Sequence, residues 1–256
     1  MPACSNDIHP SGIKIEFFED SHKYISNING TKLTYISGTQ FLGKFFPPFD
    51  PTGIITENCA KKEGITVEEI KKRWEKAGKE SCIFGTKCHE TAEDTILMQK
   101  YRNVPSNEKE RKTFEVTKQI AERFRTELDI LGVEKIVFNP YLPIPIAGTI
   151  DLFAKSRKDN NYLILDWKTN KKITVDNPYN KFCLAPISHL PDNEFYHYAL
   201  QTSLYQYLLK FGKYVPENAK FKRAIIHLTE NGYKIYQLPD LTSEIKDLII
   251  WSSCKF

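Results

Sequence analysis

The feature that most constrains this chain is a pair of strand-like runs that each carry an aspartate. The first run, residues 144–155, contains Asp151, and the second, residues 162–169, places Asp166 directly after Tyr-Leu-Ile-Leu. A short polar turn separates the runs, so we expect them to pair as neighbouring strands with facing residues in contact. Asp166 and Lys168 stand two positions apart and therefore project from one face of their strand. The sequence predicts two carboxylates and a lysine at one end of a buried hairpin.

The remaining pattern predicts a mixed α/β (α+β) protein built around one central sheet. Two Asn-Gly pairs, Asn29-Gly30 and Asn231-Gly232, are strong hairpin signals. Further strands are expected over residues 13–18, 24–36, 133–138, 221–228 and 233–238. Helices are expected over residues 67–79, 87–100, 106–131 (with Gly132 as its C-terminal cap), 194–211 and 241–252. We expect an N-terminal lobe of hairpin and helix over residues 1–80, followed by a core over residues 81–256.

Composition excludes several classes of protein. With 41% hydrophobic and 27% charged residues among 256, the chain can bury a sizeable core. No run approaches the roughly 20 apolar residues of a membrane span, and the first residues do not resemble a secretory signal. Six scattered cysteines without a Cys-x-x-Cys pair predict free thiols, and hence an intracellular, reducing compartment. The net charge of +4 permits a polyanionic partner without requiring one.

The buried hairpin needs compensation for its charge. A divalent cation such as Mg²⁺ or Mn²⁺ would supply it, and a plain cross-strand Asp–Lys salt bridge is the alternative. His89 and Glu93 lie four positions apart on one face of a predicted helix. His89 is a candidate third ligand, although a lone histidine is more often structural. Glu93 is a candidate ligand, a hydrogen-bond partner of the imidazole, or half of a helix-face pair.

Two further pairs of residues are candidates for supporting roles. Gln201 and Tyr205 stand four positions apart on a predicted helix and could order the lysine, a water molecule or a nucleic-acid backbone. The alternative is a core-facing helix with two polar tips. Trp74 and Arg73 lie among lysines, which suits base stacking beside phosphate neutralisation or, equally, an anchoring tryptophan on a solvated helix. Lys171 and Lys172 follow the Asp166 strand directly and are better placed to meet phosphates.

Taken in order, these motifs resemble one nuclease family. They are Gly85-Thr86-x-x-His89-x-x-x-Glu93, Gly148-Thr149-Ile150-Asp151, Asp166-Trp167-Lys168-Thr169 and Gln201-x-x-x-Tyr205. This set resembles the RecB-like exonuclease branch of the PD-(D/E)XK nuclease superfamily, over roughly residues 74–209. The Asp-Trp-Lys-Thr tetrapeptide with the later Gln-x-x-x-Tyr is the most specific part. Ile150 stands where the superfamily has its naming proline, a form common in this branch.

The resemblance implies a restriction-endonuclease-like core and hydrolysis of DNA phosphodiesters with one or two Mg²⁺ or Mn²⁺ ions. By that analogy the metal ligands are His89, Asp151, Asp166 and the backbone carbonyl of Trp167. Lys168 would orient or activate the attacking water, and Gln201 and Tyr205 would support the site or hold the strand. DNA contacts are expected from Arg73, Trp74, Thr169, Lys171 and Lys172.

Two cofactors found near such motifs are not expected here. Some relatives hold an iron–sulfur cluster with three cysteines beyond the Gln-x-x-x-Tyr helix, but only Cys254 lies there in this chain. Residues 38–44 approach a phosphate loop, but Phe45 stands where the metal-binding hydroxyl should be, so no ATP site or helicase motor is expected.

The expected activity is therefore that of an exonuclease acting on single-stranded DNA or duplex ends in recombination, repair or replication. The alternatives are a structure-specific endonuclease that cuts flaps or junctions, and an inactive DNA-binding module. A protein partner of such an enzyme would be a recombinase, a single-strand-binding protein or a helicase.

Overall fold

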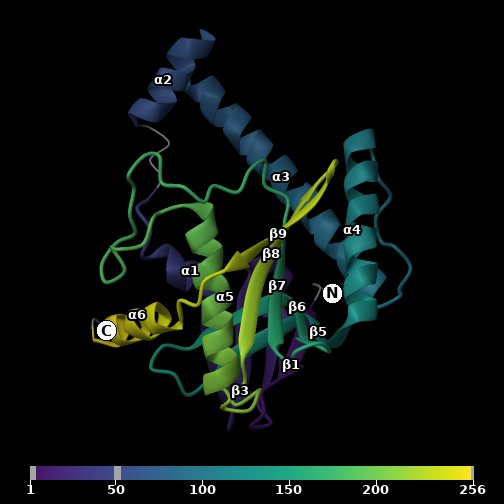
Figure 1. Ribbon diagram of the computed structural model, residues 1–256. Helices are drawn as coiled ribbons and strands as arrows, with labels where there is room; N and C mark the ends of the chain where they lie inside the picture. Colours follow the sequence, from purple (N-terminus) through teal and green to yellow (C-terminus); the bar gives the residue numbers. More distant parts are fainter. Residues whose placement is uncertain (1–3, 49–52, 255–256) are drawn as a thin grey trace.

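The computed structural model describes residues 4–48 and 53–254, and within them nine strands form one mixed sheet flanked by helices (Figure 1). The strand order is β1-β2-β3-β4-β6-β7-β8-β9, with β5 paired to β6 off this path. The mixed α/β class and the central sheet predicted from the sequence are confirmed. No helix among the described residues is both long and apolar enough to cross a membrane.

The central strands carry the motifs. Strands β6 (Ile146–Ser156) and β7 (Tyr162–Lys168) form the predicted antiparallel hairpin. Strand β5 (Leu128–Asn139) pairs antiparallel along β6, whereas β8 (Phe221–Thr229) lies parallel to β7. Strand β9 (Gly232–Leu238) closes the second predicted hairpin. The ends of β6 and β7 that carry the two aspartates are thus covered on both sides by neighbouring strands.

The N-terminal strands form a meander that joins the central sheet. They are β1 (Cys4–Ile8), β2 (Lys14–Phe18), β3 (Lys23–Ile28) and β4 (Thr31–Ser37), with the short 3-10 helix η1 (Glu19–Ser21) between β2 and β3. At its end, β4 pairs parallel with β6 through Ile36 and Ser37. Buried Ile15, Tyr24 and Tyr35 pack against the central strands, so apolar contact as well as pairing fixes the meander to the core.

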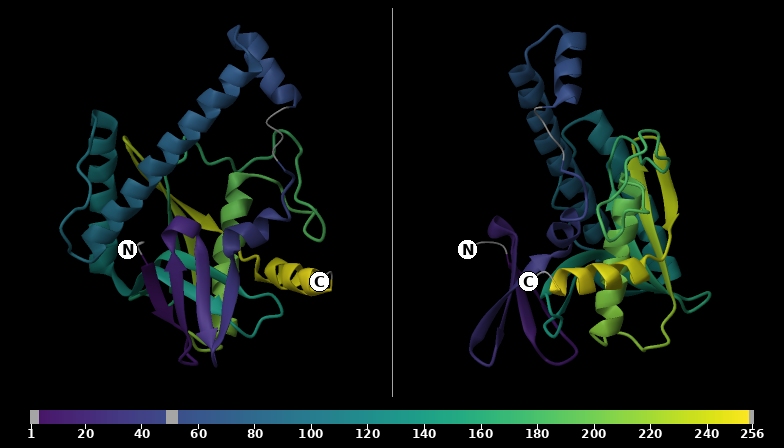
Figure 2. Two further views of the ribbon diagram at one scale, coloured as in Figure 1. Left: turned by 180° about the vertical axis from the view of Figure 1, so that it is seen from behind. Right: turned by 90° about the vertical axis from the view of Figure 1, so that its left-hand side faces the viewer.

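Helices cover the two faces of the sheet. On one face lie α1 (Gly38–Gly43), α5 (Glu194–Phe211) and α6 (Thr242–Ser253), and on the other lie α3 (Val67–Ile96) and α4 (Glu108–Glu127) (Figures 1 and 2). Alternate residues of β8 divide between the two layers, since Ile225 packs with α5 and Ile226 packs with α3 and α4. The sheet is therefore buried on both faces, which suits its apolar strands.

Two predicted boundaries are wrong. The helices expected over residues 67–79 and 87–100 are one 30-residue helix, α3, which continues through Gly85-Thr86. A glycine inside a helix lowers its stability by only about 1 kcal/mol relative to alanine. The capping box of Thr66 with Glu69 stabilises the N-terminus of the helix. The helix expected over 106–131 ends at Glu127 because residues 128–130 pair with β6 instead. Gly132, the expected cap, lies inside β5 beside a register shift.

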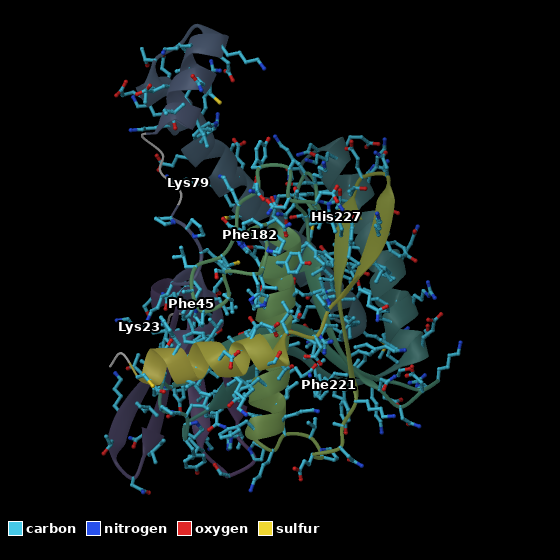
Figure 3. The ribbon with its side chains drawn as sticks, turned by 60° about the vertical axis from the view of Figure 1, so that its left-hand side comes forward. Lys23, Phe45, Lys79, Phe182, Phe221 and His227 are labelled. Carbon is cyan, nitrogen blue, oxygen red and sulfur yellow. The ribbon has the colours of Figure 1, made fainter. Side chains whose placement is uncertain are left out.

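The N-terminal half of α3 stands away from the sheet. With α2 (Ile54–Glu63) it forms a helical arm beyond the body of the molecule, and Lys79 lies on this exposed part (Figures 2 and 3). Helix α3 runs through residue 80, where the sequence suggested a division between an N-terminal lobe and a core. That division stays a prediction.

Candidate active site

Three carboxylates lie side by side across neighbouring strands. The register of β6 with β7, which pairs Leu152 with Leu165, brings Asp151 opposite Asp166 one step further on. The register of β5 with β6 brackets a second facing pair, Glu134 with Asp151. Like charges directly opposite each other destabilise a sheet. This row of acids therefore requires positive charge nearby.

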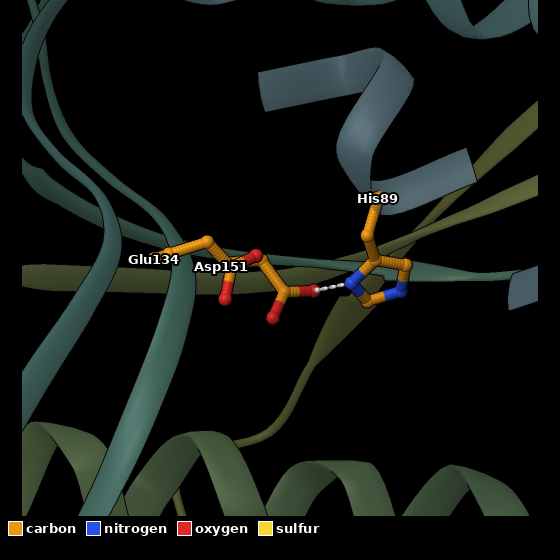
Figure 4. Close-up of side chains that lie close together, drawn as sticks. All are labelled: His89, Glu134 and Asp151. Carbon is orange, nitrogen blue, oxygen red and sulfur yellow. Dashed lines mark ion pairs between the residues drawn. The ribbon is translucent and has the colours of Figure 1, made fainter. Parts of the chain in front are cut away.

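His89 reaches the row from α3. Its Nδ1 lies 3.4 Å from Asp151 Oδ2 (Figure 4). Its Nε2 lies 2.9 Å from the carbonyl oxygen of Trp167. The backbone N–H of Trp167 donates to Asp151 Oδ2 at 2.8 Å, which orients that carboxylate. The imidazole, Asp151, Asp166 and the Trp167 carbonyl, all proposed from the sequence, thus meet at one place although 77 residues separate His89 from Asp166.

Glu134 is the residue that sequence reasoning missed. A nitrogen of His89 and one oxygen each of Glu134 and Asp151 all lie within 4.8 Å of one another, which is a spacing that could hold a metal ion (Figure 4). Glu134 has φ of 47°, in the left-handed region that a glutamate seldom adopts. Such strain persists where the surroundings enforce it, often at functional sites. The only sequence signal is an acidic residue inside the otherwise strand-like stretch 133–138.

Two carboxylates of the row, Glu134 and Asp166, have raised pKa values. Burial, followed by the charges of Asp151, Glu93 and Asp166, raises the pKa of Glu134 to about 8. Burial also raises the pKa of Asp166 to about 6, with Lys168 opposing and Asp151 reinforcing the rise. Both shifts mean that the charged forms lack sufficient positive charge nearby. A divalent cation would provide that charge.

Lys168 is the nearest cation within the chain. Its Nζ lies 2.5 Å from Asp166 Oδ2. Burial acts to lower the pKa of Lys168, but attraction to Asp166 and Asp151 outweighs it and raises that pKa above the usual range. The ammonium is therefore charged and held at the end of the acidic row. One ammonium nevertheless stands against three carboxylates, and the pKa values of Glu134 and Asp166 remain raised.

The predicted Gln201-Tyr205 pair supports the strands from α5. Gln201 Nε2 donates to the Tyr205 hydroxyl at 2.9 Å. The Tyr205 ring is buried against Gly148, where a Cβ atom would lie only 2.4 Å from the ring. Gly148 therefore permits the close packing of α5 on β6, three residues before Asp151. The hydrogen bond orients both side chains, in keeping with a supporting role.

A second aromatic on α5, Tyr198, lies against the site lysine. Lys168 Nζ lies 4.8 Å from the centre of the Tyr198 ring. The Tyr198 hydroxyl donates to Asn170 Oδ1 at 3.0 Å, and the Asn170 carbonyl lies 2.6 Å from His227 Nε2 (His227 is labelled in Figure 3). These contacts fix the chain directly after Lys168. The sequence reasoning did not include this network.

The other predicted residues divide by location. Glu93 borders the cleft and bonds Arg102, so its charge is partly matched within the chain. Thr169 also borders the cleft and lies near Gly85 of α3. Lys171 lies in a neighbouring hollow, and Lys172 is exposed. Arg73 pairs with Glu63 on the arm, and Trp74 stands 15 residues before His89, about 22 Å along the helix. Arg73 and Trp74, predicted to contact DNA, therefore do not line the cleft.

The residues present fit a divalent metal ion. Oxygen donors with one imidazole suit Mg²⁺ and especially Mn²⁺. Asp166 Oδ2 is buried, and apart from the Lys168 ion pair it has no hydrogen-bond partner among the described residues. The cleft bordered by His89, Glu134 and Lys168 is about 740 Å³ in volume. It is therefore large enough for substrate beside an ion.

Comparison with known families agrees with this geometry. The family model of the PD-(D/E)XK nuclease superfamily matches residues 61–250, well over half of the chain. The chain belongs to the PD-(D/E)XK nuclease superfamily. Members of this superfamily are metal-dependent nucleases, and the matched range includes every residue of the acidic row. No curated protein matches the chain. Its place in the RecB-like branch stays a prediction.

Proposed function

We propose that this PD-(D/E)XK protein is a deoxyribonuclease that degrades DNA from ends or along single strands, with Mg²⁺ or Mn²⁺ as its cofactor. The observation that carries the proposal is the meeting of His89, Glu134, Asp151, Asp166 and Lys168 at one end of the central sheet. A binding protein does not need an undercompensated acidic row, because buried charge of this kind costs stability.

Each residue then has a role that follows from its surroundings. His89, Glu134 and Asp151 would hold the ion, with Asp166 and the Trp167 carbonyl as further donors. When bound, the ion would neutralise charge on the phosphate and supply a nucleophile at neutral pH. Lys168, held by Asp166 and Tyr198, would direct its N–H groups at a phosphate oxygen or at the attacking water.

The shape of the cleft supports action on ends or single strands. Its lining combines α3, the end of β7, and residues of β2 and the turn that follows it, so several elements border the catalytic residues. A cleft bordered in this way would admit one strand or a DNA end more readily than the middle of a duplex. DNA-end processing in recombination, repair or replication is the process in which such an enzyme would act.

The test compares end-labelled linear DNA with covalently closed circles, each single- and double-stranded, in Mg²⁺ and in Mn²⁺. We expect linear single strands to release short products. We expect both kinds of circle to remain uncut. Cutting of circles would replace the exonuclease by an endonuclease of the flap- or junction-cutting kind. Absence of cleavage of all four substrates with both ions, under conditions where the protein is folded, would refute the nuclease proposal. Asp166→Asn serves as the control for contaminating nucleases.

A further inference from the structure

The end of β2 and the turn between β2 and β3 form one wall of the cleft that α3 also borders. Phe17, Glu19 and His22 border the same space as His89, Lys168 and Thr169. The first three belong to the N-terminal meander, and at least 67 residues separate them from His89 in the sequence. Only the joining of the meander to β6 brings them to the catalytic residues.

Contacts within the protein hold the side chains of this wall in place. Phe17 stacks on Tyr24 with ring centres 4.5 Å apart, and the His22 ring lies 5.9 Å from that of Phe17. The Tyr24 hydroxyl lies 2.8 Å from Thr149 Oγ1, two residues before Asp151. His22 adopts a left-handed conformation, and its N–H donates to the Glu19 carbonyl at 3.2 Å. The aromatic groups are therefore fixed relative to the acidic row.

The chemistry of the wall suits bases rather than phosphates. Phe17 is half-buried and His22 is exposed, so parts of both rings remain available at the cleft. The neighbouring Glu19 is exposed and would repel a phosphate. Aromatic faces accept any base by stacking, without sequence preference. In a duplex those base faces are covered by the neighbouring pairs, so a wall of this kind selects unpaired nucleotides.

We infer that Phe17 and His22 stack on the bases of a single-stranded DNA segment whose backbone runs along the acidic row. The inference rests on the proposed nuclease function and adds to it a substrate class, single-stranded DNA, and a base-binding role for the N-terminal meander. The backbone lies on the side of His89 and Lys168, and the bases turn toward β2.

Binding is measured first, with fluorescent single-stranded oligonucleotides and Ca²⁺ in place of Mg²⁺ to limit turnover. Phe17→Ala and His22→Ala should each weaken binding, and Phe17→Ala by about tenfold. Phe17→Trp should restore it, because stacking needs only an aromatic face. Phe18→Ala is the matched control, since Phe18 is similarly half-buried on the same strand but borders a different hollow. Affinities of both alanine variants equal to wild type would overturn the inference.

An abasic scan then separates base stacking from a general loss of structure. Removing the base at one or two positions of the oligonucleotide should weaken wild-type binding by the same factor as Phe17→Ala. At those positions the variant should lose nothing more, because the two changes remove one contact. If base removal and Phe17→Ala weaken affinity additively at every position, the inference is overturned, even if Phe17→Ala destabilises the fold. The same scan with His22→Ala, at an exposed position, avoids the risk of destabilisation.

Cleavage distinguishes this inference from the proposed function. Wild type should cleave single strands with a higher kcat/KM than blunt duplexes, and Phe17→Ala should reduce that ratio by about tenfold. Wild-type preference for duplex would overturn the inference while leaving a nuclease. If the wild-type protein cleaves no DNA, the proposed function is refuted. The abasic scan would still test whether Phe17 and His22 stack on bases.

Discussion

Two glutamates near α3, the buried Glu110 and the half-buried Glu134, have opposite surroundings. Glu110 accepts hydrogen bonds from the N–H and hydroxyl of Ser106 and pairs with Lys87 at 3.0 Å. Burial alone would raise its pKa, but these partners lower it. Glu134 faces other acids, and its pKa rises to about 8. The charge of Glu110 is compensated by partners within the protein, whereas the charge of Glu134 requires a bound cation.

The largest expected effect comes from replacing Lys168 beside the acidic row, compared with Lys87 beside Glu110. Lys168→Met should lower kcat by roughly 10²–10⁴, because the charged donor at the scissile phosphate is lost. Lys87→Met should leave kcat within about threefold and instead lower the free energy of unfolding by roughly 1–3 kcal/mol, since Glu110 loses its partner. Single-turnover cleavage and urea unfolding measure the two. Equal kinetic losses in both variants would erase the distinction.

Metal binding should stabilise the protein through one glutamate only. At 100 times its dissociation constant, Mn²⁺ should raise the free energy of unfolding by about 2.7 kcal/mol. Glu110→Gln should retain this gain, whereas Glu134→Gln and His89→Gln should lose most of it. Thermal unfolding with Mn²⁺ and with chelator measures the gain. A full gain in both site variants would exclude Glu134 and His89 as ligands.

The same glutamates should give opposite dependences on pH in chelator. The pKa of Glu134 is raised from 4.5 to about 8, so the folded protein loses stability as pH rises through that interval. Glu134→Gln should therefore stabilise the protein by up to about 4 kcal/mol at pH 8 and by little at pH 4. Glu110 has a lowered pKa, so its contribution is present above pH 4.5 and is lost as pH falls. Glu110→Gln should destabilise the protein at pH 7.

Urea unfolding at pH 4, 5.5, 7 and 8.5 measures both curves. If Glu134→Gln proved less stable than wild type at pH 8 without metal, the carboxylate would be satisfied within the chain after all.

The smallest expected effect is at Tyr198, which positions the site lysine. Tyr198→Leu removes the ring beside Lys168, a contact of about 0.5–2 kcal/mol, and should lower kcat by roughly 3- to 30-fold with little change in KM. Tyr198→Phe keeps the ring and should recover most of that loss. Tyr207 is the control, since it lies on the same helix and stacks on Phe211. A loss at Tyr207→Leu equal to that at Tyr198→Leu would make the effect one of helix stability.

Local pattern predicted much of the core. The helix expected over residues 194–211 has those bounds, and both predicted hairpins of the central sheet form. Asp151 and Asp166 face each other because a short turn leaves one register that buries the apolar residues. These features depend on residues near one another in the chain, so periodicity and turn signals suffice.

Other features depend on partners that the local pattern does not contain. The periodicity of residues 106–131 predicts a helix to its end, but residues 128–130 pair with β6 and belong to β5 instead. Helix α3 continues through Gly85 although a break was expected there. Glu134 gains its position through the register of β5 with β6, and Phe17 through the joining of β4 to β6.

The sequence by itself determined which groups are available for chemistry: an imidazole, the aspartates of one hairpin and the lysine beside them. Only the tertiary structure decided that Glu134 joins the acidic row and that the N-terminal meander borders the same cleft. The physical reason is that charge compensation and cleft shape are set by distances between strands far apart in sequence. Those distances follow from the packing of the whole sheet.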